Sequence, residues 1–124
     1  MKKIYLFFSL LFLCLSCSKN TYEPEDIFEL LRKGDADLEA VVSKDIGVSL
    51  VDCSTYKPKC RNVFIVKVKE LEVIFLQYDT PEEAFKSAHY IGGFVVRNWA
   101  IDEVSGEPVL EAFMMKYLGA RKAR

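Results

Sequence analysis

The chain has 124 residues, 51% of them hydrophobic, with 17 basic and 18 acidic side chains. This length allows one compact domain. A formal net charge of −1 gives no general attraction for the phosphates of nucleic acids, so we expect no nucleic-acid partner. The sequence shows no internal repeat and no low-complexity tract, which argues against solenoid and disordered proteins.

The first 20 residues have the pattern of a targeting segment. Lys2 and Lys3 precede an apolar run over residues 4–15, and Ser16 and Cys17 follow it. A helix that crosses a bilayer needs roughly 20 apolar residues, so this run is too short to span a membrane. The order of positive, apolar and small residues predicts an exported chain whose signal is removed.

This arrangement resembles the signal peptide of bacterial lipoprotein precursors, which are cut before a cysteine that becomes the lipid-bearing N-terminus. Ser16 and Cys17 match the last two positions of that family's lipobox, whereas Cys14 and Leu15 depart from it. The resemblance implies that a diacylated Cys17 anchors the protein, because two acyl chains give stable membrane attachment. The alternatives are a secretory signal cut after Ser16 without lipid and an uncleaved anchor.

The chain thus divides into a signal peptide (1–16), a lipidated N-terminus and tether (17–23), a single domain (24–119) and a basic tail (120–124). The resemblance implies that Ser18, at the second mature position, favours delivery to the outer membrane over the inner membrane. We expect an exported protein, lipid-anchored in the cell envelope.

Two cysteines remain beyond Cys17. Cys53 and Cys60 bound an eight-residue segment that contains Pro58, and in an oxidising envelope we expect a disulfide that contributes roughly 2–3 kcal/mol. Free thiols are the first alternative. Redox catalysis is disfavoured because the spacing is not C-x-x-C. A zinc site is disfavoured because His89 is the only histidine.

The first half of the domain carries two helical patterns. Pro24 begins a short helix that ends at Gly34. A second short helix begins at Asp35 or Asp37 and ends near Gly47.

Alternating apolar residues then predict strands. One strand begins at Val48, and others cover 63–68 and 71–78. The apolar positions change parity at Lys69-Glu70, which indicates either a tight hairpin or a bulge. The strand over 71–78 is apolar on both faces, so we expect it to lie in the centre of the sheet.

Helix and strand patterns continue toward the C-terminus. Thr80, Pro81 and Glu83 form a capping box at the start of a helix that ends at Gly92, and a strand follows over 94–101.

The last pattern is an amphipathic helix from Pro108 that stops at Gly119. The sequence therefore predicts an α+β domain with a small antiparallel sheet of three to four strands and helices packed on one face. Two short helices precede the sheet, and the amphipathic helix ends the domain.

Candidate catalytic and metal-binding residues are few. His89 would need a nucleophile within reach, but Ser87, two positions away, points to another side of the helix, so we interpret His89 as a surface residue. Asp102, Glu103 and Glu107 surround a turn; they lack calcium-loop spacing, and a solvated acidic turn is the preferred interpretation. We expect no catalytic residue, no metal and no cofactor.

Two surfaces remain as candidates for binding. Core packing is the default expectation for aromatic residues at these spacings, and Arg97 with Trp99, where polar and aromatic residues alternate, is the candidate exception and the predicted binding surface. The basic residues Arg121, Lys122 and Arg124 either complement the preceding helix dipole or contact anionic lipid or lipopolysaccharide.

The leading functional hypothesis is a small, non-enzymatic envelope lipoprotein. Its domain would bind or scaffold an envelope protein or glycan, and its acyl anchor would hold it to the lipid membrane. The alternative is a hydrolase, or an inhibitor of hydrolases, that acts on cell-wall or exported substrates, because two carboxylates can suffice for glycoside hydrolysis without any motif.

Overall fold

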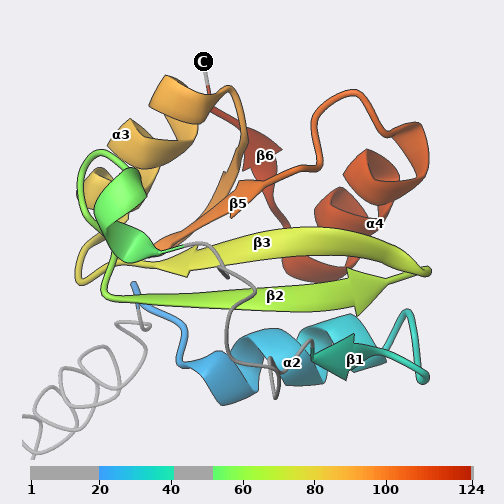
Figure 1. Cartoon of the computed structure of the whole chain (residues 1–124). Coiled ribbons are helices and arrows are strands. Elements are labelled where there is room, and N and C mark those ends of the chain that lie inside the picture. Colours follow the sequence, from blue (N-terminus) through green and yellow to red (C-terminus); the bar gives the residue numbers. More distant parts are fainter. Residues whose placement is uncertain (1–19, 41–51, 124) are drawn as a thin grey trace, which may run out of the picture.

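The computed structural model describes residues 20–40 and 52–123, and the signal segment and Cys17 lie outside these ranges. The predicted α+β class is confirmed (Figure 1). In chain order the elements are helix α2 (Pro24–Arg32), strand β1 (Glu39–Ala40), 3₁₀ turn η1 (Cys53–Thr55), β2 (Asn62–Val68), β3 (Leu71–Gln77), α3 (Pro81–Ile91), β4 (Phe94–Val96), β5 (Trp99–Asp102), α4 (Pro108–Leu118) and β6 (Arg121–Lys122).

The described strands form one antiparallel sheet of six strands in the order β1-β2-β3-β5-β4-β6. The prediction of three to four strands is too low. Strands β1 and β6 have two residues each, too few to show an alternating pattern, and a third strand was hidden in the segment 94–101. Strand β3 lies between β2 and β5, as predicted for a strand that is apolar on both faces.

The parity change at Lys69-Glu70 is a two-residue hairpin turn. Val68 pairs directly with Leu71, and both turn residues have positive φ, 51° at Lys69 and 68° at Glu70. Two left-handed residues in succession match the twist of the flanking strands. Because the chain reverses here, the apolar positions on either side of the turn face the same core.

The continuous strand predicted over 94–101 is wrong. Val96 pairs with Trp99, so the segment is a second hairpin, and Arg97 in its turn has a φ of 49°. Apolar residues on both arms gave the appearance of one long strand. Asn98 was the one residue there that favours a turn.

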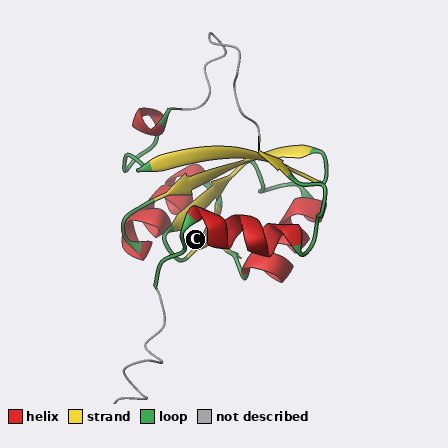
Figure 2. Ribbon diagram, turned by 90° about the horizontal axis from the view of Figure 1, so that it is seen from below, coloured by secondary structure: helices red, strands yellow, loops and turns green. Residues whose placement is uncertain are grey.

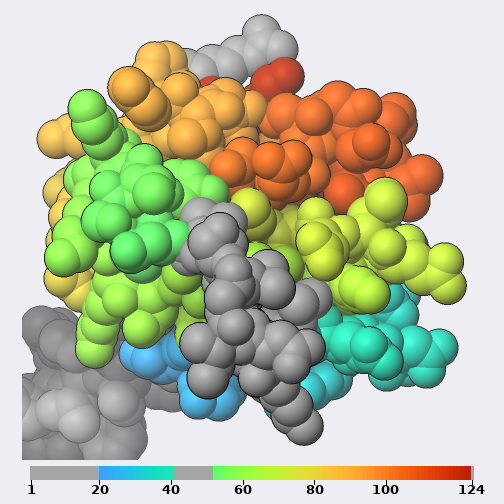
Figure 3. Space-filling view, in the orientation of Figure 1, coloured from blue at the N-terminus to red at the C-terminus, as the bar shows by residue number. Residues whose placement is uncertain are grey.

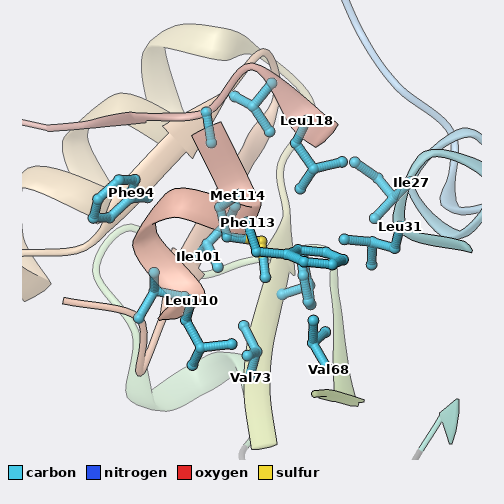
Figure 4. Close-up of a cluster of buried hydrophobic side chains, with 14 of the residues drawn as sticks. Ile27, Leu31, Val68, Val73, Phe94, Ile101, Leu110, Phe113, Met114 and Leu118 are labelled. Atoms are coloured by element: carbon cyan, nitrogen blue, oxygen red, sulfur yellow. The ribbon is translucent and has the colours of Figure 1, made fainter. Parts of the chain in front are cut away.

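Helices cover both faces of the sheet, so the prediction that they pack on one face is also wrong. On one face, α2 and α4 bury the main cluster, in which Ile27 and Leu31 point toward Phe113 and Leu118 (Figure 4). On the other face, α3 packs with the disulfide-bonded turn against a smaller cluster around Leu76. Figure 2 shows η1 on one side of the β2–β3 hairpin and α2 on the other. Helices can cover both faces because the side chains of β2, β3 and β5 that point to each face are mostly apolar.

The predicted helix limits are confirmed where capping residues define them. In α3 the Glu83 amide donates to Thr80 Oγ1 at 3.2 Å, Pro81 occupies the first turn, and Gly92 ends the helix with a φ of 66°. Helix α4 likewise ends at Gly119, with a φ of 69°.

The second short helix is not observed where the structure describes its start. Glu39 and Ala40 form β1 and pair with β2. Before them, Asp35 accepts hydrogen bonds from the amides of Asp37 at 3.1 Å and Lys69 at 2.8 Å. The Asp35 carboxylate thereby holds a turn against the β2–β3 hairpin. The chain then continues as strand β1 instead of a helix. The remainder of the predicted helix, and the strand predicted at Val48, lie outside the described residues.

The basic tail predicted after Gly119 is part of the domain. Arg121 and Lys122 form β6 along β4, and Ala120 and Ala123 on either side are buried. The small alanines allow the chain to turn back and cover the edge of the sheet.

Candidate functional site

Tyr22 fastens the start of the described chain to the β4–β5 turn. Its amide donates to Asn98 Oδ1 at 2.6 Å, and its carbonyl accepts from Trp99 Nε1 at 2.8 Å. The Arg97 guanidinium carbon lies 4.2 Å from the centre of the Tyr22 ring, within range of a cation–π interaction. Tyr22, predicted from the sequence to lie in the segment before the domain, therefore packs against the domain.

The predicted binding surface is divided by this arrangement. Arg97 is exposed, but Trp99 is 1% exposed and its ring centroid lies 5.9 Å from that of Phe64. Trp99 is therefore a core residue, which is the default expectation for an aromatic residue at this spacing. Asn98 is buried as well and donates to the Tyr78 carbonyl at 3.0 Å, so the turn is held from inside.

A groove of about 400 Å³ opens beside Tyr22. Its lining includes Tyr22, Arg97, Phe85, Leu118 and Arg121. The Arg121 guanidinium carbon lies 5.3 Å from the Phe85 ring centre. Each arginine thus sits over an aromatic ring, and we refer to this hollow as the arginine groove. It combines two positive charges with apolar walls.

The predicted disulfide between Cys53 and Cys60 is present. The loop that it closes is also held by Tyr78, whose buried hydroxyl donates to the Pro58 carbonyl at 2.7 Å and bonds to the Ser87 hydroxyl at 2.7 Å. The loop lies beside α3 on the surface (Figure 3). The disulfide and these hydrogen bonds hold the loop against α3.

A second hydrogen bond ties the same loop to the sheet. The Tyr56 hydroxyl donates to Asp102 Oδ2 at 3.0 Å. Burial raises the pKa of Tyr56 well above its ordinary value, and the negative charge of Asp102 raises it further. Tyr56 is therefore a neutral donor across the physiological range.

His89 and Ser87 do not form a catalytic pair. Ser87 is fully buried and bonded to Tyr78, whereas His89 is exposed and stacks on Phe85 with ring centroids 6.1 Å apart. This placement agrees with the interpretation of His89 as a surface residue.

The acidic turn is part of the local backbone structure. Asp102 accepts from the Glu103 amide at 2.9 Å as well as from Tyr56. Within residues 20–40 and 52–123, no three histidine, cysteine or acidic side chains are grouped so that they could hold a metal ion.

A larger hollow of about 720 Å³ lies between β1 and the β2–β3 turn. Among the described residues, its lining has two basic side chains, Lys67 and Lys69, and four acidic ones: Asp35, Asp37, Glu39 and Glu70. The excess of acidic over basic side chains makes this hollow a poor site for anions.

Among the helices in the described part of the chain, none is long and apolar enough to cross a membrane. The lipidation predicted for Cys17 lies outside the described residues.

Tyr22 was not among the site residues predicted from the sequence, and neither was the contact between Arg121 and the Phe85 ring. One signal was available for Tyr22: it precedes the helix N-cap, at the position where a hydrophobic residue staples the chain to the first turn. The pairing of Arg121 with Phe85 had no signal, because it depends on β6 joining the sheet.

Comparison of the chain with protein-family models, with curated proteins and with solved structures gives no match.

Proposed function

We propose that this chain is a small envelope lipoprotein, exported and held in the outer membrane through an acylated Cys17. Its α+β domain is a non-enzymatic module that binds or scaffolds another envelope component, a protein or a glycan. Two features support this function: the lipoprotein-like N-terminus and the hydrogen bonds that hold Tyr22 to the domain.

The observation that carries the proposal is the short distance along the chain between Cys17 and a fixed residue. Tyr22 is held by Asn98 and Trp99, and only five residue steps separate it from Cys17. Five steps of at most ~3.6 Å span about 18 Å. An acyl group on Cys17 would therefore keep the domain directly at the membrane surface.

The hydrogen bonds that hold the disulfide loop in place support a binding role. Tyr78 bonds the loop to α3, and Tyr56 bonds it to Asp102. Together with the Cys53–Cys60 bond these contacts stiffen the loop. A rigid loop loses little conformational entropy when it contacts a partner, which favours recognition.

The anchor is tested by replacing Cys17 with Ser and feeding cells a fatty acid that can be detected on protein. We expect labelling to disappear and the protein to leave the membrane fraction. Cys14→Ser is the matched control, since Cys14 would leave with the signal peptide and its loss should keep the label. Persistent labelling of Cys17→Ser would contradict the proposal.

The binding role is tested with a photoreactive amino acid at Thr55 in the disulfide loop, which is exposed. We expect a discrete adduct with one envelope component in intact cells. The control places the same amino acid at Met115 on the exposed side of α4. Equal adducts from both positions, or none from Thr55, would count against recognition through the loop.

A further inference from the structure

We propose that the arginine groove binds the phosphate of anionic phospholipids in the membrane that carries the anchor. This inference rests on the proposed anchoring through Cys17 and adds a second, direct contact between the domain and lipid. The contact would orient the domain, whereas the anchor alone only tethers it.

The chemistry of the groove suits a phosphate diester with apolar surroundings. Arg97 and Arg121 supply two guanidinium groups, and guanidinium binds phosphate oxygens through two parallel hydrogen bonds. No acidic side chain belongs to the described lining. Tyr22 and Phe85 lie under these cations and provide the amphipathic surface that aromatic residues offer at a membrane interface.

This local charge contrasts with that of the whole chain. The formal net charge is −1, so the protein as a whole is not attracted to an anionic surface. The two arginines of the groove therefore determine which side of the protein can approach an anionic membrane. Strand pairing explains the grouping: Arg121 lies opposite Val95, two residues before Arg97. Lys122 lies opposite Phe94 and therefore projects from the other face of the sheet.

The position of the groove supplies the second argument. Tyr22 forms part of its wall, and Tyr22 is at most about 18 Å of chain from Cys17. The headgroup layer of each leaflet is about 5–8 Å thick. The acylated cysteine lies at the base of that layer, so a groove beside Tyr22 is within about 10–13 Å of the outermost phosphates even with the chain fully extended.

The experiment uses the mature, acylated protein purified in detergent and reconstituted into vesicles. One vesicle type contains phosphatidylcholine alone, and the other contains phosphatidylcholine and phosphatidylglycerol in equal parts. Both carry a trace of phosphatidylglycerol with a photoreactive group in its headgroup. Mass spectrometry then locates and quantifies the labelled peptides, and fatty-acid analysis of the same sample measures acylation of Cys17.

We expect the label in residues 81–85, 95–97 and 118–121. Replacing Arg97 or Arg121 with Gln should lower it about fivefold each, and replacing both about 25-fold, because a basic residue near an anionic surface contributes about that factor. Lys122→Gln removes the same charge one position away and should leave the label unchanged. Unaltered unfolding midpoints show that each variant is folded.

Three outcomes would overturn the inference. Acylated protein whose groove label does not fall in the double variant would contradict the groove while leaving the anchor standing. Loss of the label on addition of millimolar inorganic phosphate would make the groove a site for free phosphate instead. Absence of acyl chains on Cys17 would overturn both the anchor and the inference.

Discussion

Tyr22 and Asn98 hold each other through reciprocal hydrogen bonds. The Tyr22 amide donates to Asn98 Oδ1 at 2.6 Å, and Asn98 Nδ2 donates to the Tyr22 carbonyl at 3.4 Å. Asn98 also donates to the Tyr78 carbonyl at 3.0 Å. One buried amide therefore connects the beginning of the domain, the end of β3 and the β4–β5 turn.

Replacing Asn98 with Ala should lower the free energy of unfolding by about 1–3 kcal/mol, because it leaves backbone groups at the turn without their partner. Chemical denaturation measures the change. Asn20→Ala, at an exposed position, should have almost no effect and controls for the substitution itself. Equal stability of the two variants would show that the Asn98 contacts do not hold Tyr22.

Replacing Glu70 with Gly should stabilise the protein by roughly 0.5–1 kcal/mol. Glu70 has a φ of 68°, which costs a residue with a side chain about 1–2 kcal/mol, and the greater unfolded-state entropy of glycine offsets part of the gain. Glu72→Gly, in the extended backbone of β3, should destabilise instead. The same sign of change for both variants in urea unfolding would contradict this explanation.

Replacing Gly93 with Ala should destabilise the domain by about 3 kcal/mol or prevent folding. An added Cβ would collide with the carbonyl oxygen of Ile101, and backbone on the adjacent strand cannot move aside. Gly92→Asn is the control, because open space surrounds that position and asparagine tolerates a positive φ. Thermal unfolding separates the two; a mild effect at Gly93 would refute the predicted collision.

The Cys53–Cys60 bond should contribute roughly 2–3 kcal/mol, the chain-entropy value for a loop of eight residues. The double Cys→Ser variant should lose that amount in denaturant. Wild-type protein in reductant should match the variant, and reductant should have no effect on the variant itself. If reductant leaves the stability of the wild-type protein unchanged, the disulfide does not stabilise the domain by closing the loop.

Alkaline pH should weaken the domain through Tyr56. Burial and the nearby Asp102 charge raise the pKa of Tyr56 in the folded state above its unfolded value near 10. The stabilisation is complete below pH 10 and is lost as the pH rises, because the unfolded chain then releases a proton that the folded chain retains. Tyr56→Phe should make the decline of unfolding free energy above pH 10 less steep. Identical slopes for variant and wild type would exclude Tyr56 as the cause.

Local signals in the sequence predicted the limits of α3 and α4 well. Thr80 and Pro81 begin α3, and Gly92 and Gly119 end α3 and α4, because capping depends on residues within a few positions of each other. The disulfide is also a local feature, since Cys53 and Cys60 lie only seven residues apart in the sequence.

Features that depend on distant pairing could not be predicted. Arg97 adopts a positive φ without being glycine or asparagine, so the β4–β5 turn had almost no local sign. The sixth strand was invisible because Arg121 and Lys122 form it only by pairing with β4. The arginine groove required both, and it also required the docking of Tyr22, whose partners lie 76 and 77 residues away.

The contact between α2 and α4 sets an order for assembly of the chain. Ile27 and Leu31 in the first described helix are covered by residues of the last one, and Gly34 leaves room for the Tyr117 ring (Figure 4). Since synthesis starts at the N-terminus, the apolar stripe of α2 has no lasting cover until residue 118 has been made. The nascent chain should therefore stay unfolded until its last helix arrives, which is the state that the proposed export through a secretion channel would require.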